Sequence, residues 1–303
     1  MLVLALKTQG LTKRFNGKTV VDGLTLEVPG GTVFGFLGPN GAGKTTTIRM
    51  LMGFAHPSAG SAELLGQPLG GALHKVGFLP DVPAFYPWMR ADEHLTFSGE
   101  LAGISGRTLQ LRVVELLEMA GLGDVKTRIG GFSRGMKQRL GLAQALINQP
   151  LLVILDEPTS ALDPVGRKEV LEMIAHFSGE TTVFFSTHIL ADVERVADRV
   201  GILHQGRLIK DESLATLKAS YAQPQLVVEV TGDGDLLAST LGTMPWVSHW
   251  NQDDNRFVLS VHDIEAAYHQ LPQHVSHLKL GIRHLEVSRA TLEDVFVKLV
   301  TQP

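Results

Sequence analysis

Near the start of the chain, a glycine-rich loop joins an apolar segment to a helical one. Val33–Leu37 is apolar apart from one glycine, as in a buried strand, and Thr45–Met52 carries apolar residues at helical spacing. The loop between them reads Gly38-Pro39-Asn40-Gly41-Ala42-Gly43-Lys44-Thr45 and matches G-x-x-x-x-G-K-[ST]. Its glycines let successive backbone N–H groups converge on phosphates, the helix N-terminus adds its positive end, and Lys44 reaches the terminal phosphates. Strand, loop and helix together predict an α/β fold that binds a nucleotide.

Two acids follow a second apolar run and predict a metal site beside this loop. Leu151–Leu155 has the pattern of a parallel strand buried on both faces, and Asp156 and Glu157 end it. The Thr45 hydroxyl and the Asp156 carboxylate are suitable ligands for Mg²⁺, and Glu157 can polarise a water molecule. An acidic pair after a strand also occurs as two solvated residues that begin a loop. The phosphate-binding pattern upstream favours the functional interpretation.

Composition narrows the class of protein and its partners. The chain has 303 residues, 44% of them hydrophobic and 19% charged, which suits one large domain followed by a small one. Cysteine is absent, which excludes disulfides, thiolate metal sites and a cysteine nucleophile and favours a cytoplasmic location. The net charge is −4, whereas proteins that bind nucleic acid usually carry an excess of basic residues, so no nucleic-acid partner is expected. The apolar run Leu2–Leu6 is too short for a signal peptide, and no other segment approaches a membrane span.

A helical insertion is expected in the middle of the first domain. From Pro87 to about Gly123 the apolar residues recur at spacings of three and four, and two glycines interrupt the pattern. The apolar positions are Leu111, Val114, Leu116 and Leu117, and the interruptions are Gly103 and Gly106.

The pattern changes again beyond Tyr221. The order of the expected elements is βαββαβ, which predicts a ferredoxin-like module. A last helix, Thr291–Val300, has a capping box through Thr291 and Asp294. The expected elements of the module are a strand at Leu226–Val230, a helix near Leu236, strands near Val247 and at Phe257–Val261, a helix from Asp263 and a strand at Ile282–Val287.

A third motif points to a family. Phe132-Ser133-Arg134-Gly135-Met136-Lys137-Gln138-Arg139 places a serine and a glycine at the start of a helix. With the phosphate-binding loop and the acidic pair in order, the chain resembles the nucleotide-binding subunits of ABC transporters over nearly all of residues 1 to about 220. The resemblance implies a P-loop NTPase fold in residues 1–220, with a RecA-like core containing a parallel sheet, an antiparallel β part and a helical signature subdomain. Residues 221–303 would form a small α+β, ferredoxin-like accessory domain.

The resemblance also implies roles for individual residues. Two subunits would pack head to tail, so that Ser133 and the Gly135 amide of one meet the γ-phosphate of ATP held by the other. Phe15 corresponds to an aromatic that stacks on adenine, and His188 resembles a histidine that contacts the γ-phosphate. Ser160–Asp163 resembles the loop that communicates across the dimer. The implied nucleotide-binding residues are Phe15, Gly38, Pro39, Asn40, Gly41, Ala42, Gly43, Lys44, Thr45, Thr46, Ser133, Gly135 and Asp163; the catalytic residues are Lys44, Glu157 and His188; the metal ligands are Thr45, Asp156 and Asp81.

Two places depart from the family pattern. Asp81, in Gly77-Phe78-Leu79-Pro80-Asp81, stands where members usually carry Gln or Glu, and although it is shorter, its carboxylate is still a good ligand for Mg²⁺. Arg134 and Met136 stand where many members have Gly and Gln, so a cation lies beside the expected phosphate position. The serine and the second glycine of the signature motif remain.

Two segments bear on partners. Ala290–Phe296 resembles the tail of subunits that serve ABC-2-type exporters, and residues 221–303 either stabilise the ATPase dimer or have a regulatory or specificity role. The family docks its permease on the helical insertion, residues 87–130. The adjoining segment Phe85–Met89 is rich in aromatics for a loop, so we predict that it forms part of the docking surface.

The sequence therefore predicts the ATP-hydrolysing subunit of an ABC-type exporter, with ATP and Mg²⁺ as cofactors. Glu157 would polarise the attacking water, Lys44 and Mg²⁺ would hold the developing charge, and His188 would position the γ-phosphate. The expected partners are a second copy or a related ATPase subunit, and a separate integral-membrane permease at the inner face of the cell membrane. The alternative is a soluble ABC ATPase acting on ribosomes or nucleic acid. The single ATPase domain and the negative net charge argue against it. A small-molecule kinase would need an arginine-bearing lid, and the signature segment argues against it.

Overall fold

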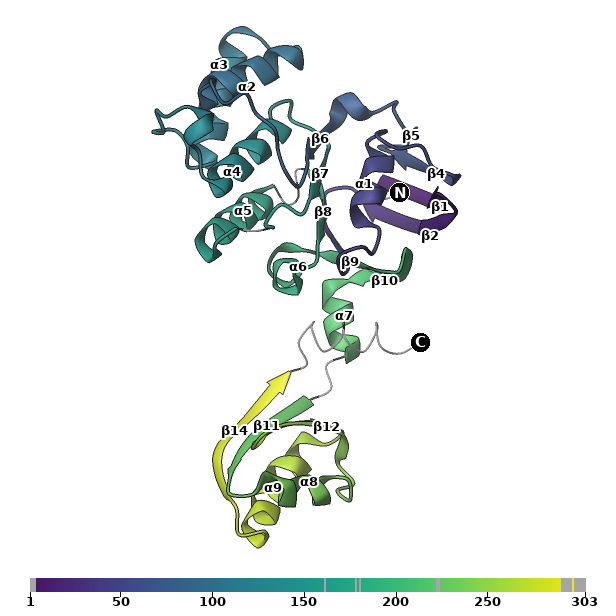
Figure 1. Cartoon of the computed structure of the whole chain (residues 1–303), viewed down its shortest axis with the longest axis vertical. Helices are drawn as coiled ribbons and strands as arrows, with labels where there is room; N and C mark the ends of the chain where they lie inside the picture. Colours follow the sequence, from purple (N-terminus) through teal and green to yellow (C-terminus); the bar gives the residue numbers. More distant parts are fainter. Residues whose placement is uncertain are drawn as a thin grey trace. The chain divides into compact units, whose positions relative to one another are not determined.

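The computed structural model describes residues 4–160, 162–177, 179, 181–221, 224–289 and 296. The chain divides into two compact units, residues 1–214 and 215–303 (Figure 1). The boundary between the units follows residue 214, earlier than the predicted division at residue 220, so nearly all of helix α7 (Leu214–Tyr221) belongs to the second unit.

A six-stranded sheet forms the centre of the first unit. Its strands pair in parallel except for the edge strand β10, which is antiparallel to β9. Strands β3, β8 and β7 are buried along their whole length, which explains the apolar runs in β3, in β7 before Asp156 and in the middle of β8. The strand order is β10 (Arg207–Ser213), β9 (Arg199–His204), β3 (Val33–Leu37), β8 (Thr182–Thr187), β7 (Leu152–Asp156) and β6 (Val76–Leu79).

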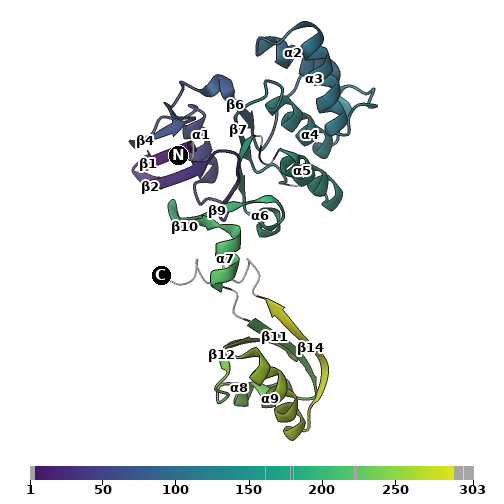
Figure 2. The ribbon, with the colours of Figure 1, turned by 180° about the vertical axis from the view of Figure 1, so that it is seen from behind.

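An antiparallel sheet and one helix cover one side of this central sheet, and three helices cover the other. Figures 1 and 2 both show α1 between the central sheet and the antiparallel sheet, with α4, α5 and α6 on the opposite side. Apolar residues of the antiparallel sheet share a core with Phe34 and Phe36 of β3 and with Ile48 of α1. The antiparallel strands are, in order, β2 (Lys18–Pro29), β1 (Leu4–Phe15), β4 (Ala59–Leu64) and β5 (Gln67–Pro68); the helices are α1 (Lys44–Leu51), α4 (Arg134–Ala145), α5 (Pro164–His176) and α6 (Leu190–Val196).

The helical insertion is confirmed, but its apolar face was partly misassigned. Helices α2 (Ala91–Leu101) and α3 (Gly106–Met119) precede α4, and the break between them falls at the two predicted glycines. Leu111 and Val114 are 62% and 54% exposed. The buried stripe of α3 consists of Leu109, Val113, Leu116 and Leu117, because a helix buries only the face that meets its neighbours. Two 3₁₀ turns, Leu73–Lys75 and Ile129–Gly131, complete this unit.

The second unit confirms the predicted βαββαβ order. Its four strands are all antiparallel, in the order β12 (Val247–Asp253), β13 (Arg256–Val261), β11 (Pro224–Thr231) and β14 (Gly281–Arg289). Helices α8 (Gly234–Leu241) and α9 (Ile264–His277) pack on the sheet around a separate core. The first and third strands occupy the middle, which is the arrangement of a ferredoxin-like module. The last predicted helix, Thr291–Val300, lies outside the described residues except for Phe296, which is helical.

Among the described residues, no helix combines the length and apolar character needed to cross a membrane.

Candidate functional site

The glycine-rich loop is shaped by its backbone. Gly41 and Gly43 have φ values of 80° and 109°, a region that glycine enters without strain. A Cβ atom on Gly38 would lie 2.3 Å from the Leu203 carbonyl oxygen, and one on Gly43 would lie 2.8 Å from the Val20 oxygen. These two glycines are therefore required by close contact with neighbouring strands. The loop curls over the N-terminus of α1, where free N–H groups favour an anion.

Lys44 is buried inside this curl. Its Nζ donates to the Gly38 oxygen at 2.7 Å and to the Pro39 oxygen at 3.2 Å, and it lies 3.1 Å from Glu157 Oε1. The Glu157 contact is an ion pair without the angle of a hydrogen bond. The ammonium group thus lies among backbone oxygens and a carboxylate, and a bound phosphate would replace these partners.

Asp156 and Glu157 stand at the carboxyl end of β7, facing the loop. Thr45 Oγ1 donates to Asp156 Oδ1 at 3.2 Å, and Ser186 Oγ donates to the same oxygen at 2.7 Å. Burial raises the pKa of Asp156, the hydrogen bonds from Ser186 and Thr45 oppose this rise, and the negative charges of Glu157 and Asp81 add to it. Burial therefore disfavours the ionised form of Asp156, and a cation at the carboxylate would stabilise it.

The donor set fits a magnesium ion. Thr45 supplies a hydroxyl oxygen, and Asp156 supplies a carboxylate in contact with that hydroxyl. Mg²⁺ prefers oxygen ligands of this kind. Asp81 follows β6, the next strand of the sheet, and its Oδ1 accepts a hydrogen bond from Ser160 at 2.6 Å. Its position beside Asp156 is consistent with a weaker or indirect contribution to the same site.

His188 lies just beyond the end of β8. Its side chain is 40% exposed, and Nδ1 is 2.9 Å from Glu157 Oε2. Glu157 therefore meets Lys44 with one oxygen and His188 with the other. The structure brings together the three residues predicted to be catalytic, from three segments far apart in the chain.

The signature residues form the start of α4. Ser133 is the N-cap, and its side chain accepts from the Met136 N–H at 3.2 Å. A Cβ on Gly135 would lie 3.9 Å from atoms of Leu162 and Ser133, which is ordinary contact; Ser133 is exposed and Gly135 is half-buried. Asp163 is the N-cap of α5, accepting from the Gly166 N–H at 3.1 Å. The two side chains thus cap the first turns of α4 and α5.

Phe15 ends β1 and is 48% exposed. Lys13 Nζ lies 4.8 Å from the centre of its ring and also donates to the His56 oxygen at 2.6 Å. A cation therefore lies over the ring, about half of which is exposed to solvent. Of the other predicted nucleotide-binding residues, Asn40 is exposed, Thr46 is half-buried and Ala42 is buried.

The sequence interpretation missed two polar groups near the site. Ser186 was not among the predicted site residues, yet it contacts both acids. Asp192, fully buried on α6, accepts from Thr159 Oγ1 and Arg167 Nε and so joins the loop after β7 to α5 and α6. A serine in an apolar strand was the one available signal for Ser186.

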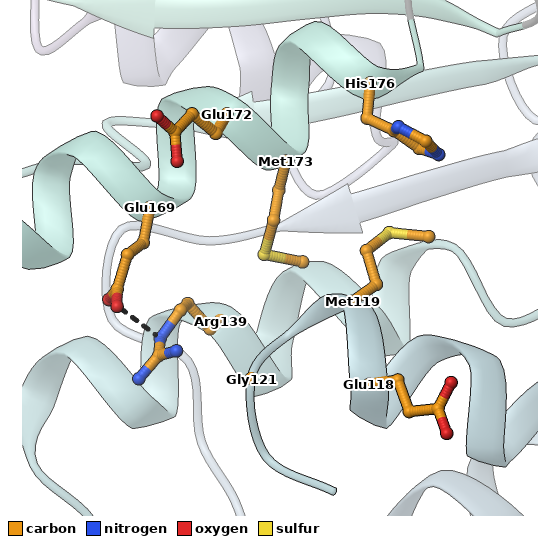
Figure 3. Close-up of a pocket in the computed structure, with 8 residues that line it drawn as sticks. All are labelled: Glu118, Met119, Gly121, Arg139, Glu169, Glu172, Met173 and His176. Carbon is orange, nitrogen blue, oxygen red and sulfur yellow. Dashed lines mark ion pairs between the residues drawn. The ribbon is translucent and has the colours of Figure 1, made fainter.

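A separate pocket of about 290 Å³ lies between α3, α4 and α5 (Figure 3). It contains none of the predicted site residues, and Arg139 crosses it to reach Glu169 at 3.5 Å and the Ala120 oxygen at 2.7 Å. Its lining consists of Glu118, Met119, Gly121, Arg139, Glu169, Glu172, Met173 and His176.

A glycine-rich loop around a lysine, with carboxylates at the end of another parallel strand of the same sheet, defines a P-loop nucleotide hydrolase. The ABC transporter family model matches residues 21–160, and the model for the C-terminal domain of DrrA1-3-like ATP-binding proteins matches residues 213–300.

Known proteins resemble the chain over nearly its whole length. The uncharacterized ABC transporter ATP-binding protein YxlF of Bacillus subtilis is 41% identical, over 97% of this chain and 99% of that protein. The bacitracin transport ATP-binding protein BcrA of Bacillus licheniformis is 36% identical, over 97% of each. The Nod factor export ATP-binding protein I of Ralstonia nicotianae is 36% identical, over 97% and 93%. A solved ATP-binding subunit of an ABC transporter superimposes with a TM-score of 0.65 at 30% identity, over 73% of this chain and 93% of that one.

The chain belongs to the family of ABC transporter ATP-binding proteins, which bind ATP and hydrolyse it to power transport. The alternative of an ATPase acting on ribosomes or nucleic acid finds no support in these relatives.

Proposed function

We propose that this chain is the ATP-hydrolysing subunit of an exporter of the ABC-2 type and that Glu157 is its catalytic base. The observation that carries the catalytic proposal is the Glu157 carboxylate, 3.1 Å from Lys44 Nζ and 2.9 Å from His188 Nδ1. Export is supported by the relative named for Nod factor export and by the match to the DrrA1-3-like C-terminal domain.

The chemistry follows from what each side chain can do when ATP is bound. Lys44 exchanges the Gly38 and Pro39 oxygens for phosphate oxygens and holds the charge that develops on them. Glu157 accepts a proton from the water that attacks the γ-phosphorus, and the bond to the bridging oxygen breaks as ADP leaves with the electron pair. His188 orients the carboxylate and reaches toward the γ-phosphate. Mg²⁺ at Thr45 and Asp156, with Asp81 nearby, neutralises phosphate charge when it is bound.

A second subunit completes the site in this proposal. Ser133 is exposed at the start of α4 and Gly135 lies in its first turn, where backbone N–H groups can receive the γ-phosphate held by another copy or by a related subunit. Asp163 lies at the start of the helix after the acidic pair, on the loop that would contact the partner. ATP would then join two subunits head to tail, and its hydrolysis would separate them.

The membrane partner is proposed to dock on an aromatic patch formed by Tyr86 and Trp88, which precede α2, and by Phe97 of α2. These side chains are 46%, 60% and 36% exposed, and the ring of Tyr86 contacts the other two. Exposed aromatics that cluster in this way are typical of protein interfaces. The chain would thereby be held at the inner face of the cell membrane by a separate permease.

The two parts of the chain take different tasks in this proposal. Residues 1–220 carry ATP binding and hydrolysis, since every candidate site residue lies there. Residues 221–303 form the accessory domain, whose separate core is consistent with a role in dimer stability or regulation.

Isolation of the chain from detergent-solubilised membranes tests the proposal. A tagged chain should co-purify with a multi-span membrane protein, and vesicles containing both should extrude substrate on addition of ATP. The Lys44→Ala variant, which loses the cation beside the phosphates, should abolish extrusion. Recovery with ribosomes and without a membrane protein would overturn the proposal.

A further inference from the structure

Ser186 lies near the carboxyl end of β8, beside the end of β7 that carries the two acids. Strands β7 and β8 pair so that Asp156 stands opposite Ser186. The serine is fully buried. Its hydroxyl donates to Asp156 Oδ1 at 2.7 Å and accepts from the Glu157 N–H at 3.0 Å. One hydroxyl group, with one donor and two acceptor positions, therefore joins two consecutive acids.

The bond to Glu157 holds an uncommon backbone conformation. Glu157 has φ of 49°, in the left-handed region that residues with a Cβ seldom adopt. Strand β7 ends at Asp156, so the next N–H has no strand partner, and Ser186 accepts it instead. This turn of the backbone directs the Glu157 carboxylate toward Lys44 and His188.

We propose that Ser186 is a positioning residue for ATP hydrolysis, whose hydroxyl sets both the carboxylate of Asp156 and the left-handed turn at Glu157. The side chains of the two acids are thus oriented before nucleotide binds, so the reaction does not pay the entropy cost of orienting them. The inference rests on the roles proposed above for Asp156 and Glu157. It adds that a buried residue without direct access to ATP controls the geometry of both.

If the Ser186 hydroxyl only stabilised the fold, removing another buried hydroxyl from the same strand should lower the ATPase rate equally. Thr182, at the opposite end of β8, provides the comparison: it is 3% exposed, and its Oγ1 accepts from the Gly31 N–H at 2.9 Å. It pairs with Leu152, at the far end of β7 from the acids. Thr182→Val therefore removes a comparable hydrogen bond from the same strand without touching the site.

The test compares Ser186→Ala, Ser186→Cys, Ser186→Thr and Thr182→Val in the full chain, reconstituted with its membrane partner. Steady-state ATPase rates are measured over a range of MgATP concentrations, and thermal unfolding checks the fold of each variant. Ser186→Ala and Ser186→Cys should lower kcat by about 10- to 100-fold, because small displacements of catalytic groups have effects of that size. KM should change by less than about threefold, because the groups that hold the phosphates are unchanged.

Recovery of ATPase activity in one variant distinguishes the effect of the Ser186 hydroxyl from the effect of the side-chain volume. Ser186→Thr, which keeps the hydroxyl, should regain most of the wild-type kcat, and Thr182→Val should keep it. Wild-type kcat in folded Ser186→Ala or Ser186→Cys would overturn the inference, as would an equal loss in Thr182→Val or no recovery in Ser186→Thr. An inactive wild type would overturn the proposed function and this inference with it, whereas an active wild type with indifferent Ser186 variants would overturn the inference alone.

Discussion

Replacing Glu157 by glutamine separates its part in catalysis from its part in the nucleotide-free structure. The substitution keeps the shape of the side chain and removes its charge. In the structure that charge is 8% exposed and faces Lys44 at 3.1 Å and His188 at 2.9 Å. The expected losses of catalytic rate and of stability can therefore both be estimated from the contacts of this one carboxylate.

The catalytic loss should be large. Proton transfer by a positioned group contributes about 10²- to 10⁴-fold, so Glu157→Gln should lower kcat by at least 100-fold, or about 2.7 kcal/mol of transition-state stabilisation. ATP binding should remain, because Lys44 and the loop amides are retained.

The stability loss should be smaller and should depend on nucleotide. Removing one member of a buried ion pair costs about 3–5 kcal/mol, but Lys44 keeps two backbone oxygens and the glutamine keeps an oxygen, so about 1–3 kcal/mol is expected. At about 2–4 °C per kcal/mol, the nucleotide-free variant should melt several degrees below wild type. Bound ATP supplies Lys44 with phosphate oxygens, so the rise in Tm on adding MgATP should be larger in the variant.

Calorimetry with and without MgATP, beside a steady-state ATPase assay, measures both quantities. Glu172→Gln is the matched control, because that carboxylate pairs with Lys168 and Arg195 at the surface and its loss should change neither. A Glu157→Gln protein that turns over ATP at the wild-type rate would refute the catalytic role. A nucleotide-induced rise in Tm no larger than that of wild type would refute the account of Lys44.

Three further variants test the metal ligand, the base-stacking residue and the docking surface. Burial raises the pKa of Asp156, so its ionised form opposes folding at neutral pH; Asp156→Asn should raise the Tm of nucleotide-free protein in EDTA while abolishing ATPase activity. This gain should shrink as the pH falls through the folded-state pKa, because the wild-type carboxyl is then neutral, and a constant gain in calorimetric scans would contradict the explanation. Phe15→Ala should raise the KM for ATP by about 10-fold and leave kcat within about twofold, since base stacking contributes about 1–3 kcal/mol; an unchanged KM would remove Phe15 from the site. Replacing Tyr86 and Trp88 by alanine should leave ATPase activity in place and abolish transport in vesicles, and transport at the wild-type rate would reject the docking surface.

Local patterns in the sequence were enough to predict the phosphate-binding loop and the strands around it. The loop is one contiguous segment whose conformation depends on its own glycines, and strands covered on both faces must be apolar along their length. The same reasoning predicted the βαββαβ order of the second unit, because each element there carries its own periodicity.

Tertiary structure decided which distant residues meet. His188 contacts Glu157 across 31 positions of the chain, and Ser186 joins both acids only because β7 and β8 pair with Asp156 opposite Ser186. Strand register depends on the packing of the whole sheet, and no local pattern encodes it. For the same reason the exposure of Leu111 and Val114 could not be predicted from helical spacing: which face of α3 is buried is set by the helices that pack against it.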